Sequence, residues 1–446
     1  MRRRAEALAQ WVGLGLAVGI AAGVASAVFL FALEHATKFR QAHEALVYCL
    51  PVAGLLIGLL YDHWGKPIKG GNNLVLDTIH ENAPQIPLRM APMVLVGTVL
   101  THVFGGSAGR EGTAVQMGAS LADWISHSLR VNKETRRQLI AAGIAGGFGS
   151  VFGTPIAGTL FGLEVVCIGK VEYDALAPAL VASLVGDYVT RKLGIVHTTY
   201  PKISPVELTP LVLGKLALIG VGMALATMAF VELTHGLKRL LERRVQKLAL
   251  RMFIGGVAIV LMWRLIGTSD YLGLGVPTIV RAFSDPQLPV YAFAAKIVFT
   301  AVTLASGFLG GEVTPLFFVG ATLGSVLARL LGLPIELGAG VGIAAVFGSA
   351  ANTPFALSIM AVELLGSAVL PHVVIVCVIA YLLSGHRSIY PAQRIVRRKH
   401  GGSLLEAPVP LRDFRDSLAP PSSPPTSHST SLEKTDDHSR TRSSEK

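Results

Sequence analysis

The sequence predicts an all-α protein that crosses a membrane many times. Of its 446 residues, 51% are hydrophobic and 15% are charged, and the mean hydropathy is +0.55. The stretch from Trp11 to Leu33 carries no charge and can cross a hydrocarbon layer of roughly 30 Å as one helix. Further apolar runs follow near 44–60, 90–104, 175–190, 211–230, 252–263, 297–309 and 367–384. A soluble core does not need this much apolar sequence, so we expect a polytopic protein embedded in a lipid bilayer.

The first apolar run is predicted to stay in the protein as a transmembrane helix. The arginines at 2–4 and the sequence at 25–27 would also fit a cleaved signal peptide. The run is longer than a typical signal core, however, and further spans follow it. We therefore expect 1–7 to be a basic cytoplasmic N-terminus.

The chain contains an internal repeat. The segment Gly143–Pro155 aligns without a gap with Gly342–Pro354, at an offset of 199 residues, and the same offset places Glu164 on Glu363. The two glutamates end matching apolar segments, and we expect them to cap backbone amides. Similar offsets elsewhere in the chain indicate a duplication rather than shared apolar composition.

The two repeats are predicted to run through the membrane in opposite directions. Basic residues lie before the first span at 11–33 but after its counterpart at 211–233, where they cluster at 238–251. Since basic residues gather on the cytoplasmic side, the two spans have opposite orientations. We predict a first transmembrane repeat at 8–195 and a second, inverted repeat at 208–400. Inverted repeats are typical of transporters that bind their substrate at the repeat interface.

The rest of the chain indicates no other class of protein. Residues 401–446 are rich in Ser, Pro, Thr and charge, and are predicted to form a disordered cytoplasmic tail. The net charge of +11 comes from clusters beside the spans, which fit cytoplasmic loops and anionic lipid rather than nucleic acid. Cys49, Cys167 and Cys377 lack the spacing of a disulfide framework or a metal site, so we expect no metal and no cofactor.

Glu111 is the strongest candidate for a functional residue. It lies in Phe104–Gly118, between two stretches that are predicted to be buried in the membrane. A charge at that depth costs several kcal/mol and marks an ion or proton path by default. The glycines around it expose backbone N–H groups, which bind anions where a helix begins, and a helix is expected from Thr113. The alternative is a structural carboxylate paired with Arg110.

The motifs around Glu111 and in the second repeat resemble those of the CLC family of anion channels and anion/proton antiporters. The resemblance spans essentially 1–400 and is carried by Gly109–Gly118, Thr154–Glu164 and Gly311–Pro315. It implies the CLC-type inverted-repeat fold with many tilted and partial helices. It also implies a homodimer with one anion pathway per subunit, in which helix N-termini converge on the anion.

The resemblance further implies roles for single residues. Glu111 would gate the anion path and carry the proton. The anion-binding positions would be Asn72, Gly109, Arg110, Gly112, Val313, Thr314 and Tyr390. Glu312 is unusual for the family and is a secondary candidate for a gate, while the proton-relay glutamate of chloride antiporters falls on Val165 and is absent. The alternative for Tyr390 is a tyrosine of the membrane interface.

Departures from the chloride-type pattern resemble the fluoride-exporting branch of the family. The serine of the usual Gly-Ser-Gly-Ile-Pro site is replaced by Asn72, as the alignment of 71–75 with 273–277 also indicates. Fluoride is strongly hydrated and accepts hydrogen bonds well, which the amide of Asn72 and the hydroxyl of Thr314 suit. The alternative for Asn72 is a turn residue or helix N-cap, and Asn73 takes its place if the register slips by one.

The sequence therefore predicts a fluoride/proton antiporter that exports cytoplasmic fluoride across a bacterial inner membrane, with both termini cytoplasmic. A chloride-selective antiporter or channel of the same fold is the alternative. An intramembrane enzyme with Glu111 as general acid or base is disfavoured, because no nucleophile, base or metal cluster accompanies the carboxylate.

Overall fold

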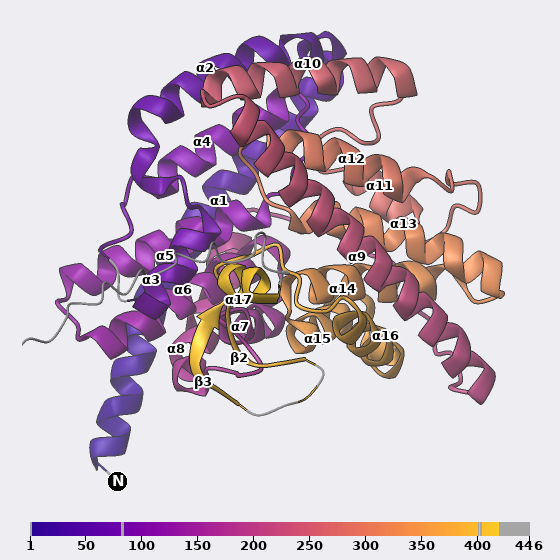
Figure 1. Cartoon of the computed structure of the whole chain (residues 1–446). Coiled ribbons are helices and arrows are strands. Elements are labelled where there is room, and N and C mark those ends of the chain that lie inside the picture. The colour runs from indigo at the N-terminus through magenta and orange to yellow at the C-terminus, as the bar shows by residue number, and fades with distance from the viewer. Residues whose placement is uncertain (1, 82–83, 400, 402–403, 419–446) are drawn as a thin grey trace, which may run out of the picture.

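The structure confirms the predicted class. It is a computed structural model that describes residues 2–81, 84–399, 401 and 404–418, and these residues fold mostly into helices (Figure 1). Five helical stretches are long and apolar enough to cross a membrane: Leu8–Ala42, Glu44–Trp64, Pro210–Arg244, Leu248–Ile266 and Val313–Leu331. The protein is therefore a multi-pass membrane protein.

Each half of the chain forms eight α-helices among the described residues. The first half contains α1 (Arg2–Ala42), α2 (Leu50–Trp64), α3 (Asn72–Glu81), α4 (Met90–Val103), α5 (Glu111–Ser128), α6 (Lys133–Phe152), α7 (Pro155–Glu164) and α8 (Leu176–Lys192). The second half contains α9 (Pro210–Arg244), α10 (Leu248–Ile266), α11 (Val276–Arg281), α12 (Ala292–Ala305), α13 (Val313–Leu331), α14 (Ile335–Ala351), α15 (Pro354–Leu365) and α16 (Leu370–Leu383).

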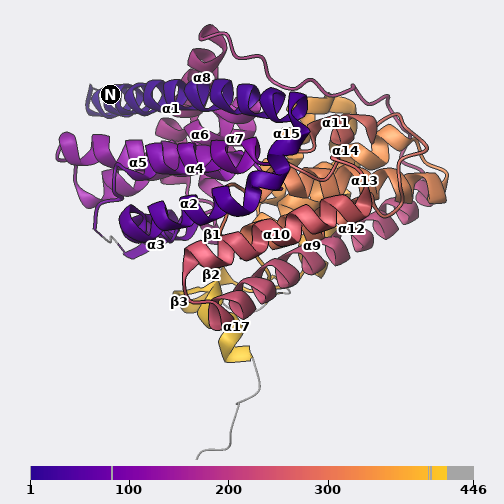
Figure 2. The same cartoon turned by 90° about the horizontal axis from the view of Figure 1, so that it is seen from above.

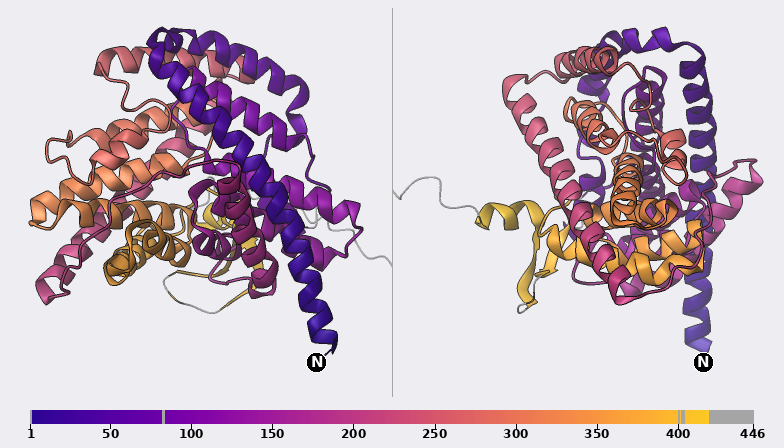
Figure 3. Two further views of the ribbon diagram at one scale, coloured as in Figure 1. Left: turned by 180° about the vertical axis from the view of Figure 1, so that it is seen from behind. Right: turned by 90° about the vertical axis from the view of Figure 1, so that its right-hand side faces the viewer.

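The long helices α1 and α9 begin the two halves and are strongly inclined to each other (Figure 1). In Figure 2 they lie on opposite sides of the molecule, and the chain runs from left to right along α1 but from right to left along α9. Thr209 starts α9 as its N-cap, because its hydroxyl accepts a hydrogen bond from the Val212 N–H, and Pro210 fits the first helical position. The N-terminal end of α1 extends beyond the other helices, so the basic start of the chain continues this helix (Figure 3).

Glycines allow the central helices of each half to pack in direct backbone contact. A Cβ placed on Gly118 of α5 would lie 2.2 Å from the carbonyl oxygen of Gly143 on α6. A Cβ on Gly320 of α13 would lie 2.1 Å from the carbonyl oxygen of Gly342 on α14. The two pairs occupy matching positions of the repeat. Such contacts exclude any side chain and replace apolar bulk in holding the helices together.

Equivalent residues of the two halves also meet each other. Phe148 and Phe347, which are related by the offset of 199, stack with ring centroids 6.2 Å apart. Gly71 and Gly273, related by an offset of 202, have nearly equal φ values of +55° and +54°. These values lie in the left-handed region, which glycine adopts without strain. The second half therefore repeats the backbone path of the first half.

Glu164 and Glu363 exchange helix caps between the halves. Glu164 accepts hydrogen bonds of 3.2 and 2.8 Å from the first backbone N–H groups of α15. Glu363 accepts hydrogen bonds of 3.0 and 2.7 Å from the first N–H groups of α7. The expected capping role of both glutamates is confirmed, since each satisfies helix-start donors that have no partner within their own helix.

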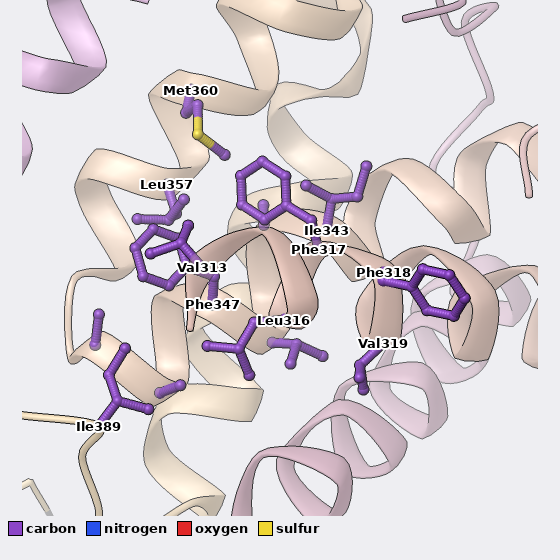
Figure 4. Close-up of a cluster of buried hydrophobic side chains, with 14 of the residues drawn as sticks. Val313, Leu316, Phe317, Phe318, Val319, Ile343, Phe347, Leu357, Met360 and Ile389 are labelled. Atoms are coloured by element: carbon purple, nitrogen blue, oxygen red, sulfur yellow. The ribbon is translucent and has the colours of Figure 1, made fainter. Parts of the chain in front are cut away.

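Apolar side chains from α13, α14 and α15 form the core of the second half. Val313, Phe317 and Phe318 extend from α13, and Phe347 and Leu357 pack from the neighbouring helices (Figure 4). The first helical residue of α13, Val313, is only 2% exposed in this cluster. The cluster therefore fixes the position of the start of α13.

The prediction that disorder begins at 401 is wrong for residues 404–418. Strand β1 (Cys167–Ile168) pairs in parallel with β2 (Arg394–Arg397), which pairs antiparallel with β3 (Leu404–Pro410), and α17 (Leu411–Leu418) follows. Leu411 and Phe414 bury against Ile168 and Ile395, so a few apolar residues in a polar segment are enough to dock it. This unit projects from one face of the molecule (Figure 3), and 419–446 lie outside the described residues.

Candidate functional site

Three helix starts meet at the centre of the molecule. A Cβ placed on Gly112, in the first turn of α5, would lie 3.1 Å from Nδ2 of Asn72 and 3.2 Å from Cα of Gly311. Asn72 is the first residue of α3, and Gly311 lies just before α13. The first N–H groups of a helix carry partial positive charge and have no partner within the helix. The arrangement therefore concentrates positive potential without placing a full cation at the centre.

The two glycine-rich motifs are joined directly. Gly109 and Gly311 form an antiparallel bridge, with N–H to oxygen distances of 2.6 and 2.8 Å. These glycines are equivalent in the repeat, so the bridge lies where the two halves meet. It holds the residues before α5 and before α13 at a fixed separation.

Glu111 lies across this junction. Its carboxylate is 1% exposed and accepts the Thr314 hydroxyl at 2.6 and 2.7 Å and the Thr314 N–H at 3.1 Å. The backbone N–H of Arg110 adds a contact of 3.1 Å, whereas the Arg110 Nε atom is 3.5 Å away. The pairing with Arg110 is thus present but longer than the bonds to Thr314. The carboxylate oxygens stand where an anion would bind the start of α13.

A cavity of about 700 Å³ opens beside this junction. Among the predicted residues, Asn72, Asn73, Glu312 and Tyr390 line it. Glu111 and Thr314 do not line the cavity, although the first turn of α5 does so through Thr113. The predicted residues therefore form two groups: a closed junction around Glu111, and a cavity wall next to it.

Asn72 and Asn73 have different roles in the wall. The Asn73 Oδ1 atom accepts the backbone N–H of Ala392 at 3.0 Å, which ties α3 to the turn that carries Tyr390. The Asn72 Oδ1 atom is buried and has no hydrogen-bond partner among the described residues. Because this oxygen is an acceptor, an anion can bind the Asn72 side chain only through its Nδ2 group, which faces the first turn of α5 beside Gly112.

Tyr390 is held rigidly at the cavity. It is 4% exposed, and its backbone N–H donates to the Ser388 hydroxyl at 2.9 Å. The fully buried Gln393 fixes the same turn, since its Nε2 atom donates to the carbonyl oxygens of Val165 at 2.8 Å and Ala351 at 2.7 Å. This network joins the ends of α7 and α14 to the turn. A tyrosine of the membrane interface would be exposed, so that alternative is wrong.

Glu312 and Val313 point to different environments. Glu312 lines the cavity, and we find no hydrogen bond to its carboxylate in the part of the chain that the structure describes. The side chain of Val313 lies in the apolar cluster of Figure 4 and is absent from the cavity lining. The side chain of Val313 therefore faces the core at the start of α13, and an anion contact at this residue stays a prediction that involves its backbone.

Sequence reasoning missed several polar residues of the cavity wall. Thr98 and Thr113 share a hydrogen bond of 2.7 Å at the wall, and Gln116 lies beside them. The signal for them was their polarity within apolar helices. A polar residue in an apolar helix need not line the cavity, however. Both ring nitrogens of His102 lie within hydrogen-bond distance of backbone carbonyl oxygens, at 2.8 and 3.0 Å. No group of three His, Cys, Asp or Glu residues in the described part of the chain is placed to hold a metal ion.

Comparison with known proteins identifies the family. A sequence model of the family described as voltage gated chloride channel matches residues 53–385. The chain is 48% identical over 416 residues to the chloride/fluoride channel protein of Pseudomonas syringae pv. tomato, covering 92% of this chain and 91% of that protein. It is 41% identical to the crystal structure of a CLC-type fluoride/proton antiporter, with a TM-score of 0.85, covering 87% of this chain and 98% of that one.

A more distant structure has the same fold. The slow cyanobacterial Cl⁻/H⁺ antiporter matches with a TM-score of 0.72 at 18% identity, covering 84% of this chain and 94% of that one. The family match extends over more than half of the chain and includes the helices that build the junction around Glu111. The protein therefore belongs to the CLC family of voltage gated chloride channels and related antiporters.

Proposed function

We propose that this protein is an antiporter that exports cytoplasmic fluoride in exchange for protons. The observation that carries the proposal is the placement of the Glu111 carboxylate on the donors at the start of α13, next to Gly112 and the Nδ2 group of Asn72. One site thus offers its donors either to a titratable carboxylate or to a small anion. Similarity to a chloride/fluoride channel protein and to a CLC-type fluoride/proton antiporter supports the choice of anion.

Glu111 acts as gate and proton carrier in this proposal. While ionised, its carboxylate is bound by the hydroxyl and N–H of Thr314 and closes the junction. Once protonated, it loses most of its attraction for the positive helix starts and swings aside. Fluoride then takes the vacated donors at Thr314, with the backbone at Gly109, Arg110 and Gly112 completing the positive surroundings. The proton moves with the carboxyl group in the opposite direction.

The cavity wall selects the anion. Fluoride loses a large hydration energy on entry, so its site must provide several strong donors. Asn72 and Tyr390 both line the cavity, and the Nδ2 group of the first and the hydroxyl of the second are the donors assigned to fluoride here. Glu312, which lines this cavity beside α13, serves as a second gate that repels an anion while it is ionised and accepts a proton otherwise.

Reconstituted protein tests the proposal. Proteoliposomes loaded with fluoride or with chloride are diluted into anion-free buffer, and anion efflux and proton uptake are recorded together. Fluoride efflux much faster than chloride efflux, with proton uptake against its gradient, is the expected result. Equal rates for both anions would support the chloride-selective alternative, and fluoride efflux without proton uptake would make the protein a channel.

We further propose a homodimer in a bacterial inner membrane with both termini in the cytoplasm. The basic residues at the start of α1 and at the end of α9 support this orientation. A single cysteine placed at either end of the chain would be labelled by a membrane-impermeant maleimide only after the cells are opened. Labelling in intact cells contradicts the orientation, and a monomeric mass in detergent contradicts the dimer.

A further inference from the structure

We propose that the cavity holds a second anion site, centred on Arg251 and Tyr61, which binds fluoride before it reaches Asn72. We call this the outer site, and the donors at Asn72, Thr314 and Tyr390 the inner site. The inference rests on the proposed function and adds a binding station to it. The same cavity is lined by Arg251, Tyr61, Asn72 and Tyr390, so an anion can pass from one site to the other.

Arg251 is a buried cation that is only partly compensated. The residue lies in the first turn of α10 and is 4% exposed. Its Nη1 atom is 3.5 Å from the Glu242 carboxylate, while its Nε atom is buried without a hydrogen-bond partner among the described residues. A buried guanidinium with an unsatisfied N–H is costly, and an anion at the Nε atom would remove that cost.

Tyr61 supplies a second unused donor nearby. Its hydroxyl is buried and also lacks a partner within the described chain. Helices α2 and α10 pack closely here, because a Cβ on Gly58 would lie only 2.3 Å from Cα of Ala249. Tyr61 of α2 and Arg251 of α10 both line the cavity, so its wall carries an unpartnered donor from each of these two packed helices.

Helix α9 continues the polar wall. Thr234, Lys238 and Glu242 are four residues apart and therefore share one face of the helix, over about 12 Å. All three line the cavity, and the Thr234 hydroxyl is buried without a partner among the described residues. The face thus presents one unused donor, one cation and the single carboxylate that faces Arg251.

The charge of the cavity favours a small anion. The lining contains six basic side chains (Lys69, Lys238, Arg239, Arg251, Arg412 and Arg415) against two acidic ones (Glu242 and Glu312). An anion held by a guanidinium N–H and a phenol hydroxyl must be a good hydrogen-bond acceptor. Fluoride meets this requirement better than chloride, so the outer site enriches the anion that the inner site transports.

Transport by Arg251→Gln tests the outer site. Initial efflux is measured against internal fluoride concentration in proteoliposomes. We expect the half-saturating concentration to rise about tenfold, as for the loss of one charged hydrogen bond, with the maximal rate and the proton-to-fluoride ratio unchanged. Tyr61→Phe is expected to shift it about threefold, because it removes only a neutral donor.

Two matched control variants distinguish anion binding at Arg251 from the general electrostatic potential of the cavity. Arg239→Gln removes the same charge from an exposed position of the same cavity, and Arg264→Gln removes it from the same helix outside the cavity. We expect a shift of less than about twofold for the first, because an exposed charge is screened, and no shift for the second. Three results for Arg251→Gln would overturn the outer site. The half-saturating concentration could stay unchanged, it could shift only as much as in Arg239→Gln, or the proton-to-fluoride ratio could change.

Binding measured without transport keeps the inference separate from the proposed function. Sodium fluoride is titrated into detergent-solubilised Asn72→Ala protein in a calorimeter, so that binding at the inner site is weakened. The outer site is supported if the single variant still binds fluoride and the double variant Asn72→Ala/Arg251→Gln does not. Both proteins must elute alike in gel filtration. Binding that survives in the double variant overturns the outer site. If wild-type liposomes move no fluoride, the proposed function fails whatever the calorimeter shows.

Discussion

The two halves of the chain build the same helix starts but give them different chemistry. Glu111 in the first half corresponds to Val313 in the second, and Asn72 corresponds to Leu274. The residues of the first half carry the unsatisfied or titratable groups, whereas Val313 and Leu274 are buried in the apolar core. The second half contributes a donor instead, through Thr314. A repeated backbone thus holds an asymmetric site, in which the first half provides the carboxylate of Glu111 and the second half the donors that bind it.

Loss of the carboxylate should have the largest effect. In Glu111→Gln the side chain keeps a carbonyl oxygen for Thr314 but cannot titrate, so proton uptake during fluoride efflux should fall to background. Parallel recordings of fluoride and pH in proteoliposomes measure this. Glu363→Gln is the matched control, because it retains an oxygen for the amides of α7, and it should couple normally. Proton uptake at the wild-type level in Glu111→Gln would remove Glu111 from the mechanism.

Substitutions at the equivalent residues Asn72 and Leu274 should have different effects, the first on fluoride affinity and the second on core packing. Asn72→Ala deletes the amide with its Nδ2 donor and should raise the half-saturating fluoride concentration about tenfold, with little loss of stability. Leu274→Ala should lower the unfolding temperature, because it leaves a cavity in the core, but it should keep the affinity for fluoride. Flux curves and thermal unfolding in detergent measure both. Equal effects of the two variants on affinity would contradict the asymmetry.

Removal of the Thr314 hydroxyl, the donor from the second half, should have a smaller effect on transport. Thr314→Val removes the hydroxyl that holds Glu111 but leaves the backbone N–H in place. We expect about a fivefold rise in the half-saturating fluoride concentration, the weaker cost of a neutral donor. Thr322→Val, on the same helix away from the junction, is the control, since its hydroxyl bonds only to carbonyl oxygens within α13. A wild-type curve for Thr314→Val would place the anion elsewhere.

The exchanged caps should affect stability and leave transport unchanged. Glu164→Ala and Glu363→Ala each leave two helix-start N–H groups without their acceptor, which costs about 1–3 kcal/mol. Because both caps join the same two packed helices, α7 and α15, their costs should be coupled, and the loss in the double variant should differ from the sum of the single losses. Denaturation in mixed micelles measures the loss. A change in the proton-to-fluoride ratio in either variant would assign that glutamate a role in coupling.

The sequence anticipated the apolar helices better than the glycine-rich ones. Runs of apolar residues predicted the regions of α1, α2, α4, α8, α9, α10, α12 and α16, whose faces meet lipid or core. Helices α5, α6 and α14 are rich in Gly, Ala and Ser and were not predicted as spans. Their stability comes from backbone contacts such as that between Gly118 and Gly143, which depend on two helices meeting.

The sequence also located most of the candidate site but did not show which contacts its residues make. An isolated carboxylate at membrane depth and the departure at Asn72 were visible without coordinates. The capture of Glu111 by Thr314, 203 residues away in the chain, was not visible. The binding of Asn73 to Ala392 was equally hidden, so the choice between the two asparagines stayed open until their partners were known.

The sequence by itself determined the membrane class and predicted the duplication and its inversion, because hydropathy, repeat offsets and flanking charge are local properties of the chain. Only the tertiary structure decided which equivalent residues became site and which became core. Val313 faces the apolar cluster and Glu312 the cavity because the bridge between Gly109 and Gly311 sets the rotation of α13. The outer site likewise depends on the tertiary structure, since only the folded chain brings Arg251 and Tyr61 to one cavity.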